Sequence, residues 1–160
     1  MTQRVILEGA PGFYKIQSIY AALRQLGVPG TLANAAQLLI TLGVAAALVA
    51  LWRSAAAFEL KVAALLIGCV LATPYVLDYD LVMLAPAIAF LAAHGLRQGF
   101  APYEVSLLVA MWVLPLIARP LAELTAVSLT PLVLFAGLAL VLQRAGMVDA
   151  AGELLPRRVP

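Results

Sequence analysis

Two aspartates, Asp78 and Asp80, lie two residues apart in the stretch TPYVLDYD, with Tyr79 between them and Tyr75 shortly before. The flanking sequence is strongly apolar, and charged groups are costly near hydrocarbon. Carboxylates in such a place could form a polar binding site or hold a cation or a proton. They could also act locally, because Asp80 is a good N-cap for a helix beginning at Leu81 and Asp78 could replace it.

The elements that position these aspartates are membrane spans. Hydrophobic residues make up 64% of the chain and charged residues 11%, with a mean hydropathy of +1.03. A soluble domain is about half apolar and about a quarter charged, and a membrane helix needs about 20 apolar residues. The sequence therefore predicts an all-α polytopic membrane protein with about five spans. We expect the spans at residues 31–52, 62–77, 80–95, 105–118 and 124–142.

A segment ahead of the first span, residues 13–26, predicts an amphipathic helix lying in the membrane interface. At 100° per residue its apolar side chains share an arc of about 140°, and Lys15 and Arg24 flank that arc. Cations in these positions can extend toward lipid phosphates. The expected organisation is an N-terminal segment 1–30, a transmembrane bundle 31–143 and a cytoplasmic tail 144–160.

The loop charges predict an orientation, because Lys and Arg in loops favour the cytoplasm. Five spans place the termini on opposite faces. One face then holds six basic residues, which are Arg53, Lys61, Arg97, Arg144, Arg157 and Arg158. The other face holds four, which are Arg4, Lys15, Arg24 and Arg119. This bias predicts the N-terminus outside, the C-terminus inside and the two aspartates facing outside. The net charge of +2 does not suggest a nucleic-acid partner.

The lengths of the second and third spans predict how deep in the membrane the aspartates lie. Each has about 16 residues, or roughly 24 Å of helix, against about 30 Å of hydrocarbon. The turn at 75–80 should then lie a few Å below the outer surface, where carboxylates are tolerated in a protein interior or a wet cavity. The sequence predicts a polar depression there, with a plain hairpin carrying helix caps as the alternative.

Arg119 is expected to pair with Glu123 on the same helix.

Two stretches resemble a known family. Residues 71–91, LATPYVLDYDLVMLAPAIAFL, resemble the Ala-Thr-Pro-Tyr-x-x-Asp-Tyr-Asp-Leu block of glycosyltransferase family 87. Residues 13–29, FYKIQSIYAALRQLGVP, resemble that family's Lys-Met-x-Ser-x-x-x-x-x-Arg-x-Leu-Gly segment. Lys15 and Ser18 stand at its Lys and Ser positions, and Ile16 replaces the Met. The two blocks cover residues 13 to about 91 and correspond to the C-terminal part of family members.

The resemblance implies a membrane glycosyltransferase of the GT-C class in the bacterial plasma membrane. Such hexosyltransferases take a sugar, often mannose, from a polyprenyl-phosphate carrier. They transfer it to a lipid or glycan acceptor on the outer side. The substrate-binding residues that the resemblance implies are Lys15, Ser18, Tyr75, Asp78, Tyr79 and Asp80. In that reading Lys15 could contact the donor phosphate, and the tyrosines could stack on the sugar or the prenyl chain.

The two aspartates have two possible roles in the family reading. They could hydrogen-bond sugar hydroxyls, or they could hold a divalent metal against the phosphate. No catalytic residue is assigned, because nothing in the chain matches the extracytoplasmic loop that carries the family's acidic general base. The chain is therefore expected to be inactive unless the missing N-terminal half is supplied. The alternatives are a non-catalytic membrane protein or assembly subunit, and a transporter fragment.

Overall fold

The described part of the chain is an all-α bundle, as the sequence predicts. The computed structural model describes residues 15–125 and 128–147. The helices in chain order are α2 (Ile19–Gln25), α3 (Gly30–Trp52), α4 (Phe58–Ala72), α5 (Leu84–Gln98), α6 (Glu104–Thr125) and α7 (Thr130–Arg144). A 3-10 helix, η2 (Asp78–Met83), leads directly into α5.

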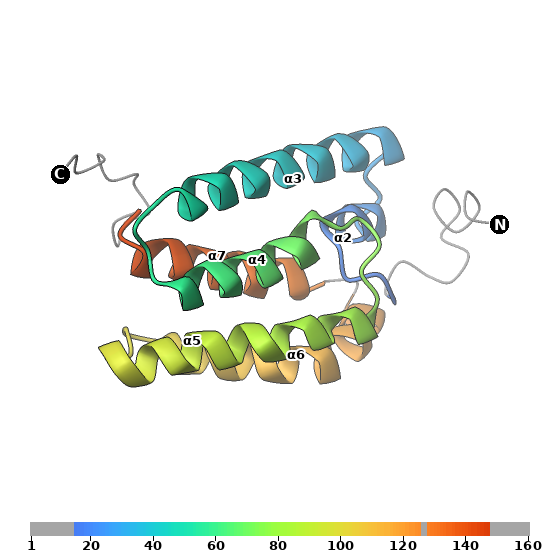
Figure 1. The fold of residues 1–160 in the computed structure, drawn as a ribbon. Helices are drawn as coiled ribbons and strands as arrows, with labels where there is room; N and C mark the ends of the chain where they lie inside the picture. The colour runs from blue at the N-terminus through green and yellow to red at the C-terminus, as the bar shows by residue number, and fades with distance from the viewer. Residues whose placement is uncertain (1–14, 126–127, 148–160) are drawn as a thin grey trace.

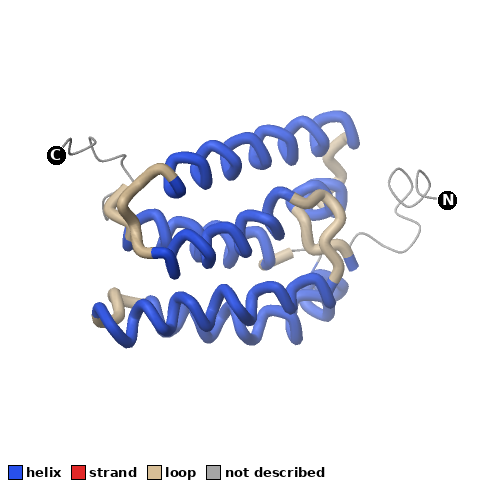
Figure 2. The backbone as a smooth tube through the Cα atoms, viewed as in Figure 1, coloured by secondary structure: helices blue, strands red, loops and turns tan. Residues whose placement is uncertain are grey.

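The long helices lie side by side with α4 at the centre (Figure 1). Helix α4 packs against α3, α5 and α7, and α6 packs against α5 and α7. The loops gather at the two ends of the bundle (Figure 2). We call one the Asp78 end, which holds α2, the loop 73–77 and η2. We call the other the Arg97 end, which holds the end of α5 and the beginning of α6.

Several helices have the length and surface of membrane spans. Within the described residues, three helical stretches are long and apolar enough to cross a membrane, namely Gly30–Trp52, Asp78–Gln98 and Glu104–Thr125. Thr130–Arg144 is a shorter apolar helix. Large apolar side chains cover their outer faces, with Leu39 70%, Trp112 72% and Leu116 77% exposed. Such a surface suits hydrocarbon better than water. The chain is an all-α membrane protein.

The centre of the bundle depends on small residues in α4. Ala63, Ala64 and Ile67 are fully buried. A Cβ added at Gly68 would lie 3.0 Å from side-chain atoms of both Val44 and Leu48 on α3. Small residues let two membrane helices approach closely and gain dispersion contacts along their length.

The N-terminal segment departs from the predicted interfacial helix 13–26. In the described part the helix begins only at Ile19, and Ile16 instead forms an isolated antiparallel bridge with Leu77. Residues 16–21 are all buried in the protein. Ile19 and Tyr20 of the predicted apolar arc are buried in the bundle, as are the polar Gln17 and Ser18, whereas Leu26 of the arc is 67% exposed. Residues 13 and 14 of the predicted helix lie outside the described residues.

The observed helices also differ in their bounds from the predicted spans. The helix expected at 62–77 runs from Phe58 to Ala72, because Thr73 is extended ahead of Pro74 and a residue preceding proline disfavours the helical region. Helix α6 continues to Thr125 through Pro115 and Pro120, where the sequence suggested an end at 118. Helix α7 begins at Thr130 rather than at 124. Helix α4 has 15 residues, or about 22 Å.

Candidate functional site

The two sequence blocks that carry the family resemblance meet at the Asp78 end. The backbone N–H of Gln17 donates to the carbonyl of Val76 at 2.7 Å, beside the bridge between Ile16 and Leu77. The rings of Tyr20 and Tyr75 meet edge to face with centroids 6.1 Å apart. The segment 16–18 is thus joined to the loop 73–77, although the blocks lie far apart in sequence.

The Gln17 side chain is the centre of a buried polar network. Its Oε1 accepts a hydrogen bond from Thr130 Oγ1 at 2.8 Å and a longer one from Ser128 Oγ at 3.3 Å. Its Nε2 donates to Asp78 Oδ1 at 3.4 Å. Gln17 is 2% exposed and Thr130 is fully buried. The Gln17 amide therefore connects the N-terminal segment with the start of α7 and with the first residue of η2.

Asp78 also has a cationic partner. Arg119 Nη1 on α6 lies 3.4 Å from Asp78 Oδ2, and both side chains remain partly open to solvent. The predicted pairing of Arg119 with Glu123 is wrong, because the tertiary fold brings Asp78, the first residue of η2, within ion-pair distance of the guanidinium. A pair this exposed contributes at most about 1 kcal/mol to stability.

Asp80 serves local structure. Its Oδ2 accepts the backbone N–H of Leu77 at 2.9 Å, and its own N–H donates to the Leu77 carbonyl at 3.0 Å. The carboxylate thereby satisfies a backbone donor at the start of η2. The helix-capping alternative describes this residue, although the cap belongs to η2 and not to a helix beginning at Leu81.

The other expected site residues differ in burial and in role. Ser18 is buried, and its Oγ accepts the N–H of Ala21 at 3.1 Å as the N-cap of α2. Lys15 is half buried at the beginning of the described chain. Tyr79 is 71% exposed. Partial burial, and to a smaller extent the neighbouring Tyr20, raises the pKa of the Tyr75 hydroxyl above its ordinary value.

A second polar contact at this end was missed by sequence reasoning. Gln37 on α3 is 4% exposed. Its Oε1 accepts the Tyr20 N–H at 3.2 Å, and its Nε2 donates to the Leu71 carbonyl at 3.0 Å. Thr41 Oγ1 donates to the Ala72 carbonyl at 3.0 Å. These bonds satisfy carbonyls that α4 leaves open where it ends. The available signal was a Gln and a Thr four residues apart on one face of an apolar span.

The two carboxylates have separate roles and partners. Asp78 contacts Gln17 and Arg119, whereas Asp80 contacts the Leu77 backbone. Within residues 15–125 and 128–147, no group of three or more His, Cys, Asp or Glu side chains could hold a metal ion. What the arrangement offers is a half-exposed guanidinium beside a carboxylate at the end of a membrane bundle. Such a group can bind an anionic oxygen.

The comparisons with known proteins add no family. No family model matches the sequence, and no curated protein or solved structure matches it either.

Proposed function

We propose that this chain is the C-terminal transmembrane portion of a membrane glycosyltransferase that uses a polyprenyl-phosphate sugar. It would transfer a hexose, such as mannose, to a lipid or glycan acceptor. The observation that carries the proposal is the joining of the two family-like blocks through Gln17, Val76 and Asp78. Blocks that contact each other through their backbones and side chains are suited to forming one site.

Arg119 gives this proposal its chemistry. When the acceptor hydroxyl attacks the sugar carbon, its proton passes to the general base that the family's N-terminal half would supply. The bond from the sugar carbon to the phosphate oxygen breaks, and the phosphate departs with the electron pair. A cation beside the departing phosphate stabilises the charge that develops on it. Arg119 is anchored to Asp78 and 47% exposed, so its guanidinium has free N–H groups for a second oxyanion. Asp78 then positions the guanidinium. Because the guanidinium is itself a cation between the carboxylate and the phosphate, this arrangement needs no metal ion there.

The orientation belongs to the same proposal. We infer that the Asp78 end faces the outside of a bacterial plasma membrane and that the Arg97 end faces the cytoplasm. Of the described basic residues, Arg53, Lys61, Arg97 and Arg144 belong to the Arg97 end by the helix order, and Lys15, Arg24 and Arg119 to the Asp78 end. The bias is small, but its sign favours an outward-facing Asp78 end, and the outer side is where the family resemblance implies that polyprenyl-linked donors are used.

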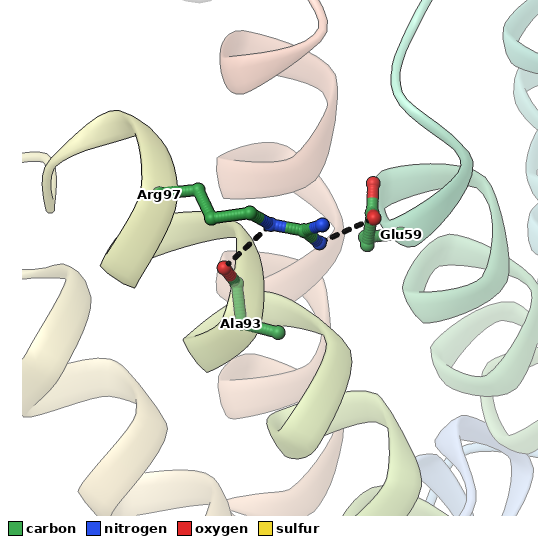
Figure 3. Close-up of polar contacts among 3 residues, drawn as sticks. All are labelled: Glu59, Ala93 and Arg97. Carbon is green, nitrogen blue, oxygen red and sulfur yellow. Dashed lines mark hydrogen bonds and ion pairs between the residues drawn. The ribbon is translucent and has the colours of Figure 1, made fainter.

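The test is donor binding by the chain in proteoliposomes, read by crosslinking of a photoreactive polyprenyl-phosphate mannose analogue. Arg119→Gln should lower crosslinking about tenfold, because one charge-assisted contact contributes about 1.5–3 kcal/mol. The matched control is Arg97→Gln. Arg97 also pairs with a carboxylate, that of Glu59, and donates to the Ala93 carbonyl, but at the opposite end of the bundle (Figure 3).

The control separates a site from a general loss of positive charge. The two variants remove the same charge, but Arg97 lies at the opposite end of the bundle from Asp78. Arg97→Gln should therefore leave crosslinking within about twofold of the parent chain. Equal losses in the two variants, or no loss in Arg119→Gln, would contradict the proposed site. The second measurement is radiolabelled mannose transfer. The chain alone should be inactive, because a missing general base costs about 10²–10⁴ in rate.

Transfer should appear only when the family's N-terminal half is supplied in trans, and Asp78→Asn should then reduce it. Turnover by the chain alone would refute the assignment as a C-terminal portion.

A non-catalytic membrane protein is the second candidate. It is favoured by one observation, which is that both aspartates already have partners within the protein. Under this alternative, Arg119→Gln would change stability and leave crosslinking of the donor unaffected. No transfer would appear with or without the N-terminal half.

A further inference from the structure

The loop between α3 and α4, residues 53–57, carries an exposed cation. Arg53 directly follows the last residue of α3 and is the only charged residue in positions 30–57. Within the described part of the chain, its side chain takes part in no hydrogen bond or ion pair. The loop lies at the Arg97 end of the bundle (Figure 2). The guanidinium is therefore open to a partner from outside the protein.

A second cation, Lys61 on α4, lies against the same loop. Its Nζ donates to the Ser54 carbonyl at 2.8 Å and to the Trp52 carbonyl at 3.4 Å, on either side of Arg53 along the chain. An ammonium has three N–H donors, so one remains. A cation here complements the negative C-terminal pole of α3. Helix capping thus accounts for Lys61 and does not require a further positive charge at Arg53. We call Arg53 and Lys61 the loop cations.

The acidic residues of the Arg97 end pair with other cations. Glu59 pairs with Arg97, and Glu104 pairs with Arg144. Neither loop cation has an ion-pair partner in residues 15–125 and 128–147. Like charges this close along one loop repel each other, and an anion placed beside them relieves that repulsion. The charge distribution therefore favours an anionic ligand at this loop.

The position of the loop suits a ligand in the membrane surface. Trp52, at the end of α3, is 45% exposed, and Phe58, at the start of α4, is 62% exposed. Exposed tryptophan favours the level of the lipid head groups. The Ser54 Oγ donates to the Leu51 carbonyl at 2.7 Å and accepts the Ala56 N–H at 3.2 Å. The loop is thus held by its own hydrogen bonds, and none of them uses the guanidinium of the exposed arginine.

We propose that the loop 53–57 binds the head group of an anionic phospholipid, with phosphatidylglycerol as the simplest example. The guanidinium of Arg53 donates to two oxygens of the phosphate, a geometry that suits its planar fork. Lys61 adds a second positive charge beside the loop. Phosphatidylcholine also has a phosphate, but its attached choline cation is repelled by the loop cations. This site is independent of the proposed transfer reaction, because Arg53 and Asp78 lie at opposite ends of the bundle.

Trp52 supplies a fluorescent reporter beside the site. The chain has two tryptophans, so a Trp112→Phe background leaves Trp52 as the single emitter. The chain is reconstituted in vesicles of equal parts phosphatidylglycerol and phosphatidylcholine, with brominated acyl chains on one lipid at a time. Quenching by each lipid gives the ratio of their binding constants at Trp52. Phosphatidylglycerol should bind about fivefold better, the factor expected for one basic side chain at a membrane surface.

Two variants and a second reporter make the test specific. Arg53→Gln should bring the ratio below about twofold, whereas Arg53→Lys keeps the charge and should keep the ratio above about threefold. The control reporter is Trp112, which is 72% exposed on α6. In a Trp52→Phe background it reports lipid away from the loop, and the ratio there should be close to one.

Inorganic phosphate separates a lipid head group from a soluble anion. At matched ionic strength, phosphate and chloride buffers should give the same ratio at Trp52. A ratio that disappears only in phosphate would assign the loop to a soluble phosphate and overturn the lipid site. Equal binding of the two lipids at Trp52 would also overturn it, as would an unchanged ratio in Arg53→Gln or the same preference at Trp112.

Discussion

Gln17 should be a stabilising residue of the Asp78 end through its bond to Thr130. Replacing Gln17 with Leu keeps nearly the same volume and removes the amide. Thr130, which is fully buried, then loses the acceptor that lies 2.8 Å from its hydroxyl. The bonds to Ser128 and Asp78, at 3.3 and 3.4 Å, are longer and contribute less. The loss is therefore dominated by one buried hydroxyl.

The magnitude follows from that single group. An orphaned buried hydroxyl costs about 1–3 kcal/mol, and interhelical hydrogen bonds in membrane proteins average about 0.6 kcal/mol with a maximum of about 1.7. We expect Gln17→Leu to destabilise the bundle by about 1–2 kcal/mol. Thr130→Val should cost less, because Gln17 Oε1 keeps Ser128 as a donor. The double variant should be about 1 kcal/mol more stable than the sum of the two single effects predicts.

The assay is reversible unfolding in mixed micelles of SDS and a mild detergent, with all four members of the double-mutant cycle measured under one condition. Gln98→Leu is the control, since Gln98 is an exposed glutamine at the end of α5, and it should change stability by less than about 0.5 kcal/mol. Additive effects, with a coupling below about 0.3 kcal/mol, would refute the hydrogen bond between Gln17 and Thr130. A Gln17→Leu effect no larger than that of Gln98→Leu would also refute it.

Further outcomes are expected from topology and packing. In a Cys69→Ser background, an impermeant maleimide added to intact cells should label a cysteine that replaces Tyr79 but not one that replaces Tyr103. These two exposed residues lie at opposite ends of the bundle. The reverse labelling pattern would overturn the orientation. Gly68→Val should destabilise by about 1–3 kcal/mol in the same unfolding assay, since its Cβ meets α3 side chains at 3.0 Å. Gly43→Ala, where a Cβ meets nothing within 4 Å, should be neutral or stabilising by up to about 1 kcal/mol. Equal losses at both glycines would contradict the packing of α3 on α4.

The sequence predicted the fold class because hydropathy acts locally. A run such as 31–52 is apolar over its full length, and a helix is the structure that satisfies its own backbone in hydrocarbon. Helix α3 accordingly covers Gly30–Trp52. Bounds were less accurate where a proline was involved, because the effect of a proline depends on its surroundings. Pro74 follows the end of α4, whereas Pro115 and Pro120 lie within a continuous α6.

The amphipathic arc of 13–26 predicted a helix in the membrane interface with its apolar face buried in lipid, but residues 16–21 are all buried in the protein and Leu26 of the arc is 67% exposed. Both lipid and protein offer an apolar surface, and periodicity does not distinguish them. In the structure the Gln17 N–H donates to the Val76 carbonyl, and the chain ahead of α2 is joined to the bundle there. A hydrogen bond between residues so distant in sequence leaves no local pattern.

Sequence alone determined that Asp78 and Asp80 lie at a helix junction in a membrane protein, because charge spacing and apolar runs are properties of neighbouring residues. Only the tertiary structure decided that Asp80 caps η2 while Asp78 meets Gln17 and Arg119. Two aspartates of identical chemistry separated by one tyrosine differ in role because their partners come from other segments. Side-chain partners are fixed by how the helices pack, and that packing depends on all the helices together.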